Sequence, residues 1–285
     1  MKFDGIEDFT VEAGDSAKID LWVDTNDASS TGATSGNYLK LNLNCDNDIT
    51  SNYCKFVGKS SGSTINEDTV NTYVLANAQQ IRKTRPTITK ASGSPSGAAT
   101  PGFSEALRLN VSADSRGYVT LNSLLFELSS TDNGSSKWNQ CGDGTSTELA
   151  SATKWSFYKS SDPSNLLDDS TDWTFIKSTG AACTSTEDVD MAYALLDFDD
   201  ASGSTAAPEI GAGQTITFIL EVDTTGASSS SDDSFRVSIP TETTADALST
   251  PRDACTWEDA NQNSGADINC NYIKELPVRG GTFVY

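Results

Sequence analysis

Apolar residues recur at every second position in short segments along the whole chain. The clearest run is Leu107-Arg108-Leu109-Asn110-Val111. Side chains of a β-strand point alternately to the two faces of its sheet, so this period places one face on a core and the other in water. The same alternation predicts strands at residues 19–23, 39–43, 119–121, 124–128, 155–157, 173–175, 194–198, 218–222 and 235–239.

The segments between these strands carry turn residues and little helix signal. Gly, Ser, Asp and Asn cluster there, and Asp, Ser and Thr compete with helical backbone hydrogen bonds. A helix is arguable only over residues 69–82, where β-branched residues at the start favour a strand and a loop instead. A shift of the apolar phase between Leu121 and Leu124 indicates a β-bulge. We therefore predict an all-β fold of antiparallel, Ig-like β-sandwiches.

An internal repeat indicates two tandem domains. Residues 11–25 align with residues 210–224 at an offset of 199, sharing Ala-Gly at a turn and then Leu, Val, Asp and Thr along a strand. So long a period describes tandem modules rather than a solenoid. We predict a complete sandwich over residues 85–285 and a partial one over residues 1–84, which carries only the closing strands of the repeat.

Three explanations of the partial module remain open. The chain is a segment of a longer tandem array, or strands from another subunit complete the module by β-strand addition. Alternatively, residues 1–84 form a small sandwich alone, stabilised by a disulfide. The expected partners are therefore copies of this chain or neighbouring modules of a longer one.

Six cysteines fall into three pairs that are close in sequence, and no CxxC motif of a zinc or redox site occurs. We predict the disulfides Cys45–Cys54, Cys141–Cys183 and Cys255–Cys270. The alternative is six buried free thiols in a cytosolic protein. Abundant Ser, Thr, Asp and Gly with few Lys favours an exported protein, and hence an extracellular location.

Composition excludes several classes of function. The chain has no histidine, which removes the Ser-His-Asp triad and histidine-metal sites, and we expect no enzymatic activity. A net charge of -21 repels phosphate backbones, so we expect no nucleic-acid partner. We expect no membrane insertion, because no apolar run approaches the roughly 20 residues of a membrane span.

Two further features are candidates for binding. Asp197, Asp199 and Asp200 end a predicted strand and enter a Gly-Ser loop, where they offer oxygen ligands for a structural Ca²⁺ ion. The alternative is a solvated acidic surface, with no cofactor. Trp22 lies on the otherwise polar face of its predicted strand. It is either an exposed platform for a sugar ring or partner, or a residue covered by a neighbouring module or loop.

Several stretches carry a resemblance to a known class of proteins. These are residues 83–87, 107–114, 118–122 and 210–215, and above all the ending Tyr272-Ile-Lys-Glu-Leu-Pro-Val-Arg-Gly-Gly-Thr282. They resemble β-sandwich modules of large predicted secreted surface proteins of candidate-phylum (Patescibacteria-type) bacteria. The resemblance implies a secreted, cell-surface location and a structural or adhesive role. Together with the repeat, it leads us to predict a structural protein of a surface layer or filament, or alternatively an adhesin that binds surface glycans. It implies no catalytic residues.

Overall fold

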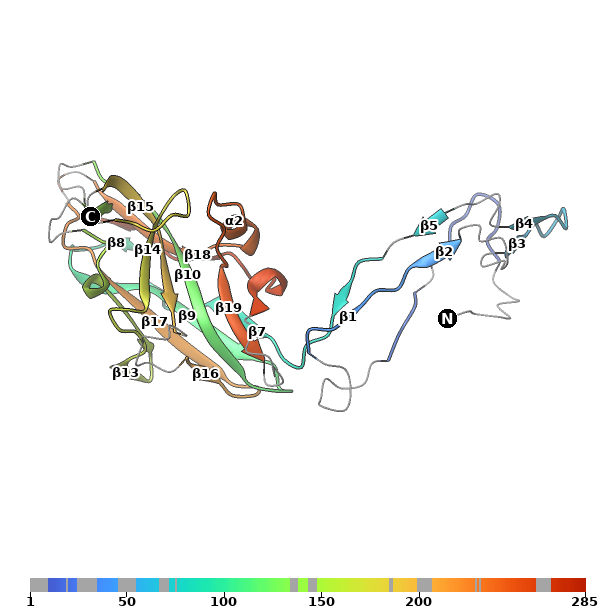
Figure 1. The fold of residues 1–285 in the computed structure, drawn as a ribbon, viewed down its shortest axis with the longest axis horizontal. Helices are drawn as coiled ribbons and strands as arrows, with labels where there is room; N and C mark the ends of the chain where they lie inside the picture. Colours follow the sequence, from blue (N-terminus) through green and yellow to red (C-terminus); the bar gives the residue numbers. More distant parts are fainter. Residues whose placement is uncertain are drawn as a thin grey trace. The chain divides into compact units, whose positions relative to one another are not determined.

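The computed structural model divides the chain into two compact units, Met1–Arg82 and Lys83–Tyr285, called unit 1 and unit 2 here. Figure 1 shows the strands of each unit along the chain. The structure describes residues 10–18, 20–24, 35–45, 55–66, 72–74, 76–133, 138–142, 148–184, 187–198, 207–228, 230, 232–259 and 268–285.

Unit 2 contains a five-stranded antiparallel sheet in the order β13-β12-β17-β9-β7. Its members are β7 (Pro86–Lys90), β9 (Phe103–Ala113), β12 (Trp155–Lys159), β13 (Asp162–Leu166) and β17 (Thr215–Asp223). Strand β17 is the centre of this sheet. It places Leu220 opposite Leu107 of β9 on one side and Phe157 of β12 on the other.

The larger sheet of unit 2 is built around β10 (Val119–Thr131), which pairs with β15 (Glu187–Asp197), β16 (Glu209–Ile210), β18 (Ser234–Ile239) and β19 (Cys255–Asp259). The sheet is completed by β8 (Gly97–Ala98), β11 (Gln140–Gly142), β14 (Trp173–Lys177), β20 (Ile268–Asn269), β21 (Val278–Arg279) and β22 (Phe283–Val284). Short helical turns are η1 (Ala152–Lys154), α2 (Glu242–Asp246) and η2 (Cys270–Tyr272).

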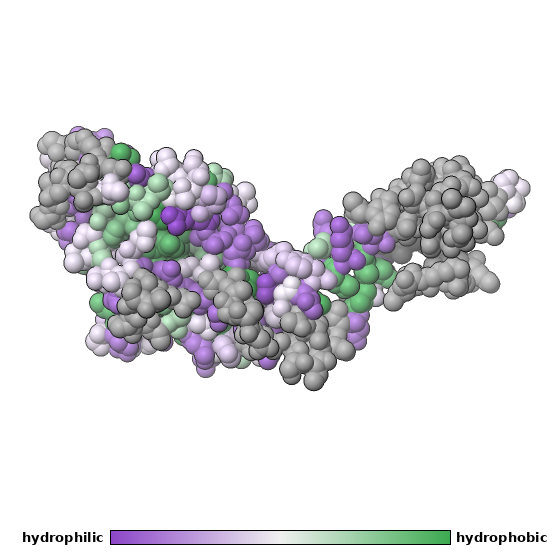
Figure 2. All heavy atoms as spheres, in the orientation of Figure 1, coloured by the Kyte–Doolittle hydropathy of each residue, from purple (hydrophilic) through white to green (hydrophobic). Residues whose placement is uncertain are grey.

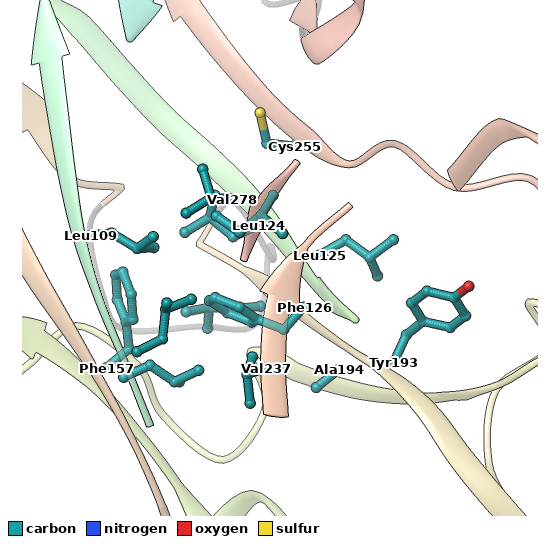
Figure 3. Close-up of a cluster of buried hydrophobic side chains, with 14 of the residues drawn as sticks. Leu109, Leu124, Leu125, Phe126, Phe157, Tyr193, Ala194, Val237, Cys255 and Val278 are labelled. Carbon is teal, nitrogen blue, oxygen red and sulfur yellow. The ribbon is translucent and has the colours of Figure 1, made fainter. Parts of the chain in front are cut away.

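The two sheets of unit 2 pack against each other through an aromatic core (Figure 3). Phe126 of β10, in the larger sheet, meets Phe157 of β12, in the smaller one, at 6.2 Å between ring centroids. Phe126 also meets Trp173 at 6.1 Å, and Phe157 stacks on Phe218 at 5.3 Å. Burial of alternate residues from both sheets is the arrangement of a β-sandwich.

The strands predicted in unit 2 are confirmed, and so is the bulge. The register of β10 against β19 shifts between Leu121 and Ser123, as the slip of apolar phase predicted. The helix α2 was not predicted. It follows Pro240, and its N-cap Thr241 accepts a hydrogen bond from the backbone N–H of Thr244 at 3.1 Å.

Unit 1 shows three separate two-stranded antiparallel pairs among its described residues. They join β1 (Tyr38–Leu39) to β6 (Gln79–Gln80), β2 (Leu43–Cys45) to β5 (Thr72–Val74), and β3 (Lys55–Val57) to β4 (Thr64–Asn66). The strand predicted at residues 39–43 is divided between β1 and β2. In the segment at residues 69–82, the described residues form β5 and β6 and no helix, as the β-branched residues at its start favoured. No described residue of unit 1 with a defined exposure is buried.

We expect the side chains buried between the two sheets of unit 2 to contribute most to its free energy of unfolding. Phe157→Ala empties a fully buried position between the sheets. We expect it to lower the free energy of unfolding by about 3–5 kcal/mol, measured by urea denaturation. Phe103→Ala removes an exposed ring from β9, in the same sheet, and should change stability by less than about 1 kcal/mol. Equal losses for the two variants would contradict this assignment of the core.

Candidate functional site

Trp22 is the most exposed large apolar residue of the described chain, with 90% of its surface accessible. Residues 20–24 form no β-ladder, so the strand predicted at residues 19–23 is not seen there; Ile19 itself lies outside the described residues. Trp22 is therefore uncovered within this chain, and its role as a binding platform stays a prediction.

The apolar residues beside Trp22 are exposed as well. Val11, Leu21 and Val23, called the open face here, are 46%, 51% and 41% accessible. Their counterparts at the 199-residue offset are Ile210, Leu220 and Val222, and each of these is 0% accessible. Two copies of one pattern thus have opposite exposures. Hydrophobic atoms appear at the surface of unit 1 in Figure 2.

The turn between Val11 and Leu21 has the same local structure in both copies. Gly14 and its counterpart Gly213 both have positive φ, at 88° and 69°. The backbone N–H of Asp15 donates to the carbonyl of Glu12 at 3.0 Å, and that of Gln214 donates to Gly211 at 2.9 Å, at the same offset. Local interactions therefore fix the conformation of the turn. The burial of the residues that follow it depends instead on which strands lie beside them.

Those neighbours are known from unit 2. There β17 lies between β9 and β12, and the next strand of the repeat, β18, pairs with β10. Unit 1 has a counterpart of the pair formed by β18 and β21. At the offset of 199 residues this counterpart is the pair of β1 and β6, whose register differs from that of β18 and β21 by one residue. Its described residues contain no counterpart of β9, β10 or β12 paired to the open face.

Two predicted disulfides are present. Cys141 is bonded to Cys183 and Cys255 to Cys270, with Cα–Cα distances of 5.1 Å and 5.4 Å. The first closes a loop of 42 residues and the second one of 15 residues. The predicted bond Cys45–Cys54 lies outside the described residues, because Cys54 and the side chain of Cys45 are not described.

The predicted calcium loop is only partly described. Asp197 ends β15, is partly buried, and donates its backbone N–H to the carbonyl of Asp172 at 2.9 Å. Asp199 and Asp200 lie outside the described residues. Calcium at this loop stays a prediction.

A carboxylate cluster that sequence reasoning missed lies at the helix α2. Glu242 is buried, with 4% of its surface accessible, whereas Asp246 and Asp253 are exposed. Each contributes a carboxylate oxygen, and these oxygens lie within 4.8 Å of one another. Glu242 Oε2 accepts hydrogen bonds from the backbone N–H groups of Ala254 at 2.9 Å and Cys270 at 3.3 Å. Glu242 thus links α2 to both ends of the Cys255–Cys270 loop.

The environment of Glu242 favours its protonated form. Burial raises the pKa of Glu242 to about 8, and the neighbouring carboxylates of Asp253 and Asp246 raise it further through their negative charges. The hydrogen bond from Ala254 acts in the opposite direction. The only sequence signal for this cluster was the N-cap Thr241 after Pro240, which marks a helix that brings Glu242 and Asp246 onto one face.

Comparison with protein-family models and with curated proteins finds no match to this sequence. Among the described residues, no helix is both long enough and apolar enough to cross a membrane.

The raised pKa predicts how stability varies with pH in the presence of EDTA. Glu242 has a pKa near 8 in the folded protein and an ordinary value of 4.5 in the unfolded chain. Between these values the folded protein holds a proton that the unfolded chain releases, so stability falls as the pH rises. We expect Glu242→Gln to reduce this fall, by at most about 1.4 kcal/mol per pH unit, in urea denaturation from pH 5 to pH 8.

The control is Glu209→Gln, which neutralises an exposed carboxylate in β16 with the same change of charge. It should keep the pH dependence of the wild type. Identical slopes for the wild type and Glu242→Gln would show that Glu242 does not hold the proton.

Proposed function

We propose that this chain is a structural protein of an extracellular surface layer or filament, and that its β-sandwich modules assemble by strand complementation. The observation that carries the proposal is the contrast between the open face and its counterparts. Val11, Leu21 and Val23 are exposed in unit 1, whereas Ile210, Leu220 and Val222 are fully buried in unit 2.

The pairing of β17 defines what a complementing segment must offer. In unit 2 its apolar residues are covered because β9 and β12 pair along both edges and β10 lies in the facing sheet. A segment of a second copy or an adjacent module, with alternating apolar residues like those of β9, would pair with residues 20–24 in the same way. Full burial of a side chain such as Leu21 or Val23 contributes about 1.5–3 kcal/mol before the entropy cost of association.

Three features support an extracellular location. Two disulfides link strands and loops of unit 2, and such bonds persist in oxidising compartments. The net charge of -21 keeps an exposed protein well solvated. The resemblance of residues 83–285 to modules of secreted bacterial surface proteins points the same way.

If the chain assembles through the open face, self-association should depend on the side chain of Leu21. Leu21→Ser in the full chain removes the most exposed apolar side chain of the open face. We expect it to weaken self-association at least tenfold, measured by light scattering and sedimentation over a range of concentrations, with loss of filaments or layers in electron micrographs. Leu166→Ser is the matched control, because Leu166 has a similar exposure of 46% but lies in β13 of unit 2.

The proposal is wrong if the wild-type chain stays monomeric at all concentrations and residues 10–82 resist proteolysis. It is also wrong if Leu166→Ser weakens association as much as Leu21→Ser, because the contact would then lie outside the open face.

The exposure of Trp22 favours a second candidate function, that of an adhesin that binds surface glycans. An indole ring with 90% of its surface accessible can stack on a sugar ring. If this function holds, a glycan array should show binding that Trp22→Ala abolishes and that Phe103→Ala, another exposed aromatic residue, retains. An array without hits would remove this candidate.

A further inference from the structure

Three carboxylates meet at one end of unit 2 without a positive partner. Glu242 and Asp246 begin and end α2, and Asp253 lies just before β19. Arg252 is the nearest basic residue in sequence, but its guanidinium donates to the carbonyl of Gly180 at 3.2 Å and 3.3 Å. Within the described part of the chain, no lysine or arginine forms an ion pair with the three.

One carboxylate oxygen of this cluster is buried without a hydrogen-bond partner. Glu242 Oε1 is buried and accepts no hydrogen bond, whereas Oε2 is occupied by two backbone N–H groups. A buried carboxylate oxygen without a partner costs free energy. Glu242 as a whole is 4% accessible, so this oxygen is largely shielded from bulk solvent. This oxygen lacks a positively charged or hydrogen-donating ligand.

We propose that Glu242, Asp246 and Asp253 together bind one calcium ion. Calcium bonds to oxygen at about 2.3–2.6 Å, so two oxygens on a common ion lie at most about 5 Å apart. The three carboxylate oxygens lie within 4.8 Å of one another and meet this limit. The exposed Asp246 and Asp253 give the ion a path from solvent, and water molecules complete the six to eight ligands that calcium takes.

The ion would connect two parts of unit 2. Glu242 already holds the backbone at Ala254 and Cys270, next to the two cysteines of one disulfide. Calcium would add a link from α2 to the segment at Asp253. This role is structural, and it is independent of the open face in unit 1.

The test uses the full chain, stripped of metal with EDTA and dialysed. Titration calorimetry with calcium chloride should show one binding site, and calcium should raise the melting temperature of unit 2 by several degrees. Glu242→Gln and Asp253→Asn should each weaken binding at least tenfold and remove the thermal shift. The matched control Glu209→Gln should bind as the wild type does. Magnesium should bind more weakly than calcium, because it demands a smaller octahedral site.

Several outcomes would overturn the proposal. One is the absence of both binding heat and thermal shift at millimolar calcium, which would leave the proton as the group that neutralises Glu242. Another is binding that survives Glu242→Gln and Asp253→Asn but is lost in Asp197→Asn, which would move the ion to the loop after β15. Tighter binding of magnesium than of calcium would refute the choice of ion.

Discussion

The structure of unit 2 depends on the contact between the apolar faces of its two sheets. A strand with alternating polarity is stable only when its apolar face meets another one, since hydrogen bonds along its edges leave that face in water. Phe126 and Phe157 make this contact from opposite sheets, and Trp173 and Phe218 extend it on either side. The long pairing of β9 with β17 then follows, because register in a half-buried strand is fixed by which face must be covered.

The same requirement explains why one sequence pattern has two outcomes. The turn at Gly14 has the conformation and hydrogen bond of the turn at Gly213, so local chemistry is satisfied in both units. Beyond the turn, Leu220 lies on a strand that pairs with β9 and β12. Leu21 pairs with no strand among the described residues. The difference between a buried strand and an exposed one lies in the neighbours, which are long-range contacts. The exposed copy therefore has the sequence of a core strand, but its apolar side chains lie in solvent.

Much of the fold follows from sequence because its signals are local. The period of two located β9, β10, β17 and β18, and the phase slip located the bulge at Leu121. Proximity in sequence paired Cys141 with Cys183 and Cys255 with Cys270. The carboxylate cluster could not be found in this way. Glu242 and Asp253 are 11 positions apart on different elements, and only the fold of α2 against the loop before β19 brings them together.

Glu242 shows how a polar side chain can be fixed by backbone geometry rather than by charge. Its Oε2 satisfies two buried N–H groups, at Ala254 and Cys270, that would otherwise have no partner near the disulfide. An apolar residue at this position would leave both donors unsatisfied, and an amide could satisfy them through one oxygen. The backbone bonds therefore explain why an acceptor stands here, but not why it is an acid with Asp246 and Asp253 beside it. Three carboxylates in so small a space repel one another unless a proton or a cation lies between them. The acidic character of the cluster is thus the part that its structural role leaves unexplained, and the proposed calcium ion would account for it.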